Sequence, residues 1–82
     1  MENHFVYIIY SSANDIFYEG YTTDVEQRIL YHNKNKSRYT ANKGPWKLVF
    51  TKQFVSKKDA LIEEKRLKKL NRRSIEKLIS EY

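Results

Sequence analysis

Two runs of β-branched and aromatic residues, at positions 4–10 and 16–22, constrain the fold of this chain most strongly. Such runs favour β-strands, and the small and polar residues 11–15 between them are typical of a turn, so the pattern predicts a β-hairpin. Side chains alternate between the two faces of a strand. An even number of turn residues would therefore put Tyr7 and Tyr18 on one face as direct or diagonal neighbours, and an odd number would separate them.

A capping-box pattern indicates where the first helix begins, because Thr23 is followed three positions later by Glu26. We expect the Thr23 hydroxyl to accept a hydrogen bond from the Glu26 amide and the helix to run to about residue 33. The spacing of a helix then predicts one stripe that faces the sheet. This stripe consists of Val25, Arg28, Ile29 and His32.

The second half of the chain predicts a third strand at residues 46–54 and two more helices, capped by Ser56 and begun by Ser74. The strand is expected to carry Trp46, Leu48 and Phe50 on one face. The residues expected to face inward on the second helix are Ala60, Leu61, Glu64, Leu67 and Lys68, and those on the third are Ile75, Leu78 and Ile79. Glu63 is expected to lie in solvent. The order ββαβαα predicts one α+β domain, residues 1–82, whose three-stranded, mostly antiparallel sheet is flanked by helices.

Composition limits the class of protein. The chain has no cysteine, which excludes disulfides and cysteine-based zinc sites. No apolar run is long enough to cross a membrane, and residues 1–4 do not resemble the start of a signal peptide. We therefore expect a cytoplasmic protein without a membrane partner, and a monomer is the default expectation.

The basic residues are unevenly distributed over a chain whose net charge is +6. Residues 33–58 contain no acid, and residues 65–73 contain six Lys and Arg and no acid. Such stretches favour a polyanionic partner, although basic side chains can also serve only to solubilise a surface. The residues expected to contact nucleic acid are Lys34, Lys36, Arg38, Lys43 and Lys68.

Five side chains on the predicted inner faces suit phosphodiester hydrolysis, which needs a base, a cation near the phosphate and often a metal ion. Glu64 lies among apolar residues and needs a partner, which could be a metal, an arginine or a tyrosine hydroxyl. Mg²⁺ can bind through only one or two carboxylates. The planar guanidinium of Arg28 suits phosphate, and His32 follows it by one helical turn. Tyr7 and Tyr18 would supply phenolic oxygens, which become basic only near a cation.

Each of these residues also has a plainer explanation. Paired tyrosines on a hairpin usually serve packing, and Arg28 could form a salt bridge with Glu64. His32 could be a surface or helix-end histidine. Gly20 could mark a bulge or a close approach of the backbone.

The tripeptides Val6-Tyr7-Ile8 and Tyr18-Glu19-Gly20 are followed by Arg28, ten residues after Tyr18, and by the block Ala60-Leu61-Ile62-Glu63-Glu64. This pattern resembles the GIY-YIG nuclease domain over nearly the whole chain. The likeness is greatest to short stand-alone bacterial proteins related to the catalytic domain of a structure-specific resolvase subunit.

The resemblance implies DNA strand cleavage that depends on one Mg²⁺ or Mn²⁺ ion bound by Glu64. It further implies that Arg28 is the cation near the scissile phosphate, that His32 lies near the same phosphate, and that Tyr7 and Tyr18 position or deprotonate the attacking water. Branched or damaged DNA is an expected substrate, and a protein partner could supply specificity.

Three positions depart from the family pattern, and the first is Val6, which stands where the first tripeptide of the family has its glycine, as is common in this branch. Glu19 replaces an aliphatic residue and is expected to face away from Tyr18. Tyr21 stands where a smaller or basic residue is usual and is expected to narrow the cleft. The alternative functions are a nucleic-acid-binding module without catalysis and, in third place, a protein-interaction domain.

Overall fold

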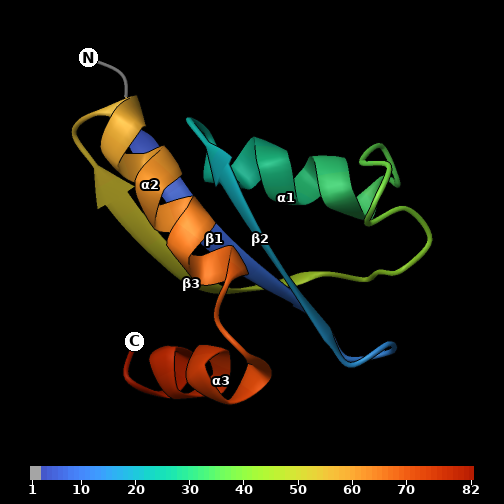
Figure 1. The fold of residues 1–82 in the computed structure, drawn as a ribbon. Helices are drawn as coiled ribbons and strands as arrows, with labels where there is room; N and C mark the ends of the chain where they lie inside the picture. The colour runs from blue at the N-terminus through green and yellow to red at the C-terminus, as the bar shows by residue number, and fades with distance from the viewer. Residues whose placement is uncertain (1–2) are drawn as a thin grey trace.

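A computed structural model of the chain describes residues 3–82 as one three-stranded sheet with three helices (Figure 1). The elements are β1 (His4–Ser11), β2 (Ile16–Thr22), α1 (Val25–Asn33), β3 (Lys47–Phe54), α2 (Lys57–Lys68) and α3 (Arg72–Ser80). The strand order is β2-β1-β3 with both pairs antiparallel, which confirms the predicted α+β class and the order ββαβαα. The expectation that residues 1–4 are not the start of a signal peptide concerns Met1 and Glu2 as well, and these two lie outside the described residues.

The hairpin turn has the even length that the sequence argument required. Ser11 pairs with Ile16, which leaves residues 12–15 as the turn. Tyr7 pairs with Gly20. Ile9 is the next residue of β1 on the same face, and it pairs with Tyr18. Tyr7 and Tyr18 are therefore diagonal neighbours on one face of the sheet, as predicted.

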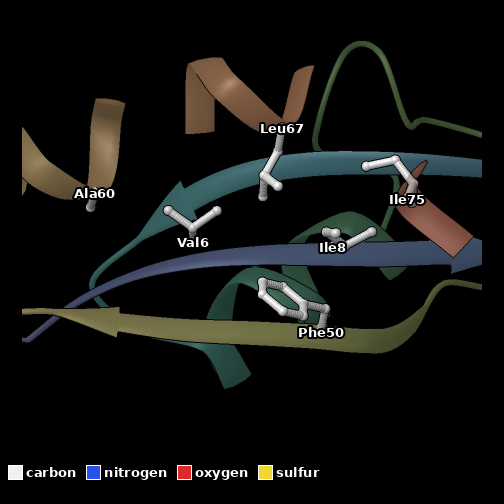
Figure 2. Packing of buried hydrophobic residues seen from close by; sticks show 6 residues of the cluster. All are labelled: Val6, Ile8, Phe50, Ala60, Leu67 and Ile75. Atoms are coloured by element: carbon white, nitrogen blue, oxygen red, sulfur yellow. The ribbon is translucent and has the colours of Figure 1, made fainter. Parts of the chain in front are cut away.

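The sheet separates two apolar cores. Figure 2 shows the larger one, in which α2 and α3 pack on the sheet through Val6, Ile8, Phe50, Ala60, Leu67 and Ile75. The smaller core lies on the opposite face and contains Tyr7, Ile9 and Trp46, with Tyr18 and Ile29 packed against it. Both tyrosines of the hairpin therefore face α1, while α2 covers the other side of the sheet.

A bulge turns apolar residues of β3 to opposite faces of the sheet. Phe50 pairs with Ile8, whereas Leu48 pairs with Ile9, and the register shifts between these two partners. Because Ile8 and Ile9 point to opposite faces, Phe50 and Leu48 do so as well. The prediction that the even-numbered apolar residues of β3 share one face is therefore wrong. The extra residue, Val49, packs with Phe50 against the larger core.

Helix α1 begins one residue later than predicted. Asp24 is its N-cap, and the Asp24 carboxylate accepts a hydrogen bond of 3.1 Å from the Gln27 amide. The predicted Thr23 cap is wrong. Thr22 instead stabilises the backbone just before the helix, because its hydroxyl accepts a hydrogen bond of 3.0 Å from the Asp24 amide. Asp ranks with the best N-cap residues, so the local chemistry allows either start.

Ser56 caps α2 as predicted, whereas α3 is capped by Asn71 and begins before the predicted Ser74. Ala60 and Leu67 are buried as expected, and Ile75 is the buried residue of α3. Leu61 and Lys68 are exposed, contrary to prediction. Within residues 3–82, no helix combines the length and apolar character that crossing a bilayer requires.

Candidate active site

A buried pair of side chains, Tyr7 of β1 and His32 of α1, forms the centre of the site. Each is 2% exposed, and the Tyr7 hydroxyl lies 2.8 Å from His32 Nε2. The other ring nitrogen, Nδ1, lies 2.7 Å from the Thr40 hydroxyl. His32 is thus an internal hydrogen-bonding residue and not a surface histidine. Its predicted partners on the inner stripe of α1, Val25, Arg28 and Ile29, are half-buried.

Tyr18 of β2 lies between this pair and the surface. Its ring centroid is 5.3 Å from that of His32 and 5.5 Å from that of Tyr39, with which it stacks. The Lys68 ammonium lies 4.8 Å above the Tyr18 ring. Tyr18 is half-buried whereas Tyr7 is enclosed, so Tyr18 is the phenol that a bound substrate meets more readily.

Gly20 provides the space that Tyr7 occupies. A Cβ atom at residue 20 would collide with the Tyr7 ring and hydroxyl. The φ of Gly20 is not positive, so a side chain is excluded by close approach and not by backbone conformation. Of the two plainer explanations for this glycine, close approach is therefore the correct one.

The charges of Arg28 and Glu64 both act on the two phenols. Burial is the main cause that raises the pKa of Tyr7 and of Tyr18. Glu64 raises both pKa values further, and Arg28 opposes this by lowering them. Although Glu64 belongs to the helix on the far face of the sheet, it acts on these phenols because α2 packs against β2, the edge strand. Within residues 3–82, Arg28 and Glu64 form no ion pair with each other.

Glu64 is suited to hold a hard cation. Its side chain is half-buried and has no hydrogen bond or ion pair with any residue in 3–82. These residues contain no cluster of three or more His, Cys, Asp or Glu. A single carboxylate whose charge acts on two phenols, completed by water, matches the oxygen preference of Mg²⁺ and Mn²⁺.

Glu63 is the adjacent residue on α2, and the prediction that it lies in solvent is wrong. Its side chain is 14% exposed and accepts hydrogen bonds of 2.7 and 2.8 Å from the Arg66 guanidinium. That guanidinium lowers the pKa of Glu63. The two adjacent glutamates therefore differ sharply, since Glu63 is neutralised within its own helix and Glu64 is not.

The imidazole of His32 is neutral at physiological pH. Burial lowers the pKa of His32 from 6.5 to about 4, and the positive charge of Arg28 contributes in the same direction. A neutral imidazole accepts through one nitrogen and donates through the other, which matches the two hydroxyl partners found here.

This shift predicts that the protein loses stability in weak acid. As pH falls below 6.5 the unfolded chain binds a proton that folded His32 takes up only near 4, so the free energy of unfolding decreases across that window. We expect a loss of about 2 kcal/mol between roughly pH 7 and pH 4.5, measurable by urea unfolding. The loss should persist in His4→Gln and shrink in His32→Gln; an equal loss in both variants would assign it to other groups.

The predicted nucleic-acid contacts fall into two groups. Lys43 lies 4.1 Å above the Tyr39 ring, so Lys43 and Lys68 flank the stacked pair of Tyr39 and Tyr18. The other three residues lie exposed at the end of α1 and in the loop that follows it; they are Lys34, Lys36 and Arg38. A role of either group in binding nucleic acid stays a prediction.

The departures at Glu19 and Tyr21 lie on the face of the sheet opposite the two tyrosines, although the Glu19 carboxylate still raises the pKa of Tyr18. Glu19 pairs with Ile8 and so faces away from Tyr18, as expected. Tyr21 pairs with Val6 on that same far face, where its hydroxyl lies 2.8 Å from His4 Nδ1. The expectation that Tyr21 narrows the cleft is therefore wrong.

Sequence reasoning missed Thr40 and Tyr39, which lie in the loop between α1 and β3. Thr40 is fully buried, and its carbonyl accepts from the indole of Trp46 at 3.3 Å. Asn33 fixes the end of the loop by accepting from the Trp46 amide at 2.6 Å and donating to its carbonyl at 3.2 Å. A polar loop has no periodicity from which the burial of one hydroxyl could be predicted.

Known proteins are similar to this chain over most of their length. Residues 3–78 match the model of the GIY-YIG catalytic domain. UPF0213 protein BH0048 of Halalkalibacterium halodurans is 44% identical over 95% of this chain and 83% of that protein. UPF0213 protein NP_0776A of Natronomonas pharaonis is 38% identical over 96% of this chain and 93% of that protein. The solution NMR structure of BH0048 covers 95% of this chain and 83% of its own, with a TM-score of 0.61. The chain therefore belongs to the GIY-YIG family.

Proposed function

We propose that this chain is a divalent-metal-dependent endonuclease that hydrolyses phosphodiester bonds in DNA. One observation carries the proposal: the phenols of Tyr7 and Tyr18 share a face, and the opposite charges of Arg28 and Glu64 both act on them. Membership of a family described as a catalytic domain supports it.

Each side chain has a distinct part in the proposed reaction. Glu64 holds one Mg²⁺ or Mn²⁺ ion, which when bound acts as a Lewis acid toward the phosphoryl oxygens. Arg28 supplies a permanent positive charge that can pair with the scissile phosphate. Tyr18, the more accessible phenol, orients the attacking water. Tyr7 stays protonated because its pKa is raised, and His32 holds its hydroxyl in place.

The DNA backbone would cross the basic surface beside Tyr18. The net charge of +6 favours a polyanion, and Lys43 and Lys68 flank the aromatic pair at the mouth of the site. The more distant contacts would be Lys34, Lys36 and Arg38. We propose that branched DNA is among the substrates, that the protein acts as a cytoplasmic monomer, and that a protein partner adds specificity.

The direct test is cleavage of end-labelled DNA by the purified protein. We expect cleavage with Mg²⁺ or Mn²⁺ and none after chelation, and faster cleavage of a flap than of a plain duplex. Failure to cleave duplex, flap and single-stranded DNA in the presence of either metal would contradict the proposal. Equal rates on flap and duplex would remove branched DNA as the preferred substrate.

A binding module without catalysis is the alternative that the same experiment identifies. It predicts DNA binding that weakens steeply with salt because phosphate contacts release counterions. It also predicts that binding is unchanged in Tyr18→Phe and that no strand is cut. Salt-sensitive binding combined with metal-dependent cleavage would favour the enzyme.

A further inference from the structure

The guanidinium of Arg28 lies over an aromatic ring at the edge of the site. Arg28 and Tyr31 are three residues apart on α1, a spacing that makes two side chains neighbours on a helix surface. The central carbon of the guanidinium, Cζ, lies 5.0 Å from the centroid of the Tyr31 ring. This distance is within the range of a cation–π interaction, in which the face of a ring attracts a cation.

The contact with Tyr31 leaves the N–H groups of Arg28 unused. Within residues 3–82, the arginine side chains that donate hydrogen bonds or form ion pairs are those of Arg66 and Arg72, and Arg28 does neither. Asp24 lies one helical turn before Arg28, but its carboxylate caps the helix. A ring face attracts the cation without accepting its N–H groups in their plane, so these donors stay available to an anion.

An open hollow of about 450 Å³ gives an anion access to this guanidinium. The residues that line it are Thr22, Asp24, Gln27, Arg28 and Tyr31. On its other side Arg28 acts on the site, because its charge lowers the pKa of both Tyr7 and Tyr18 against the effect of burial. The same half-buried guanidinium therefore borders the hollow and influences the two phenols.

We propose that Tyr31 is a positioning residue that holds the guanidinium of Arg28 ready for the scissile phosphate. An arginine side chain has many rotamers, and ordering it when substrate binds costs conformational entropy. The Tyr31 ring restricts Arg28 before DNA binds and does not compete with phosphate for its N–H groups. A carboxylate partner would restrict Arg28 as well, but the phosphate would have to displace it. The benefit to cleavage rests on the proposed nuclease function, whereas the arrangement of Arg28 over the ring does not.

NMR of the free protein, without metal or DNA, tests this arrangement. Ring currents shift nuclei above an aromatic ring upfield, so the side-chain signals of Arg28 should lie upfield of those of the exposed Arg38. Arg28→Lys identifies the signals by removing them. The upfield shift should persist in Tyr31→Phe, which keeps the ring, and disappear in Tyr31→Leu. Unshifted Arg28 signals in the wild type, or signals that Tyr31→Leu leaves unchanged, would overturn the proposal whether or not the protein cleaves DNA.

Single-turnover cleavage of bound DNA tests the effect on the reaction. We expect Tyr31→Leu to slow cleavage about fivefold, the rate equivalent of an exposed cation–π contact, with less than about a twofold change in DNA affinity measured by fluorescence anisotropy. Tyr31→Phe should cleave at the rate of the wild type. Tyr82→Leu is the control, because it removes an exposed tyrosine that bonds the Thr51 hydroxyl at 3.1 Å, and it should change neither property.

Three results of the cleavage assay would overturn the proposal. An unchanged rate in Tyr31→Leu would show that holding Arg28 does not matter for the reaction. Equal slowing by Tyr31→Phe and Tyr31→Leu would assign the effect to the hydroxyl and not to the ring. A loss of DNA affinity as large as the loss of rate would mean that Tyr31 contacts DNA itself and does not act through Arg28.

Discussion

Replacing Glu64 with glutamine is expected to slow metal-dependent DNA cleavage by roughly 100- to 1,000-fold, because it removes a charged group that stabilises the transition state through the metal. Glutamine keeps the shape of the side chain, so the fold and the affinity for DNA should change little. Single-turnover cleavage rates and fluorescence anisotropy measure the two properties separately. Titration with Mn²⁺ should broaden NMR signals near residue 64 in the wild type and not in the variant.

Glu63→Gln is the matched control for this substitution. It changes the adjacent residue of α2 in the same way, but Glu63 is paired with Arg66 and faces no phenol of the site. We expect normal cleavage and only a small loss of stability, since an ion pair within one helix contributes little. An equal loss of cleavage in both variants would mean that α2 contributes through its stability and not through Glu64.

The second large effect is expected for Gly20→Ala. The added methyl would collide with the Tyr7 ring, and the ring is enclosed, so Tyr7 must move away from His32. Overpacking of this kind typically costs about 1–3 kcal/mol of stability. Because the displaced phenol leaves its hydrogen bond, we also expect a drop of about 100-fold in cleavage, the size typical of misplaced reacting groups. Denaturant unfolding and single-turnover rates check the two effects.

Gly44→Ala separates this mechanism from a general effect of losing a glycine. A Cβ at residue 44 would lie 3.3 Å from Asn33 Oδ1 and 3.3 Å from Trp46 Cδ1, which a small shift can relieve. Cleavage by Gly44→Ala should stay close to that of the wild type. Full activity of Gly20→Ala would show that the position of Tyr7 does not matter for the reaction.

The strand pattern predicted the hairpin and, on the condition of an even turn length, that Tyr7 and Tyr18 share a face, because side chains alternate along both strands. The stripe of α1 was predicted from spacing alone, and its polar member His32 is buried as expected. The charges of Arg28 and Glu64 both act on the pKa of Tyr18, although their helices pack on opposite faces of the sheet. The sequence thus specified most of the elements that build the site.

Features that depend on contacts between distant segments were not predictable in this way. The bulge that turns Phe50 away from Leu48 adds one residue to β3 without changing its composition. The burial of Thr40 depends on His32 and Trp46, which belong to other segments. The cap of α1 was misassigned because neighbouring Thr23 and Asp24 both suit an N-cap.

The four-residue turn at positions 12–15 limits how this hairpin can change in length. Inserting or deleting one residue there would reverse the faces of β2 and present Glu19 to α1 in place of Tyr18. A change of two residues would restore the original faces. Insertions in this turn, for example to attach a tag or a fluorophore, should therefore be made in steps of two.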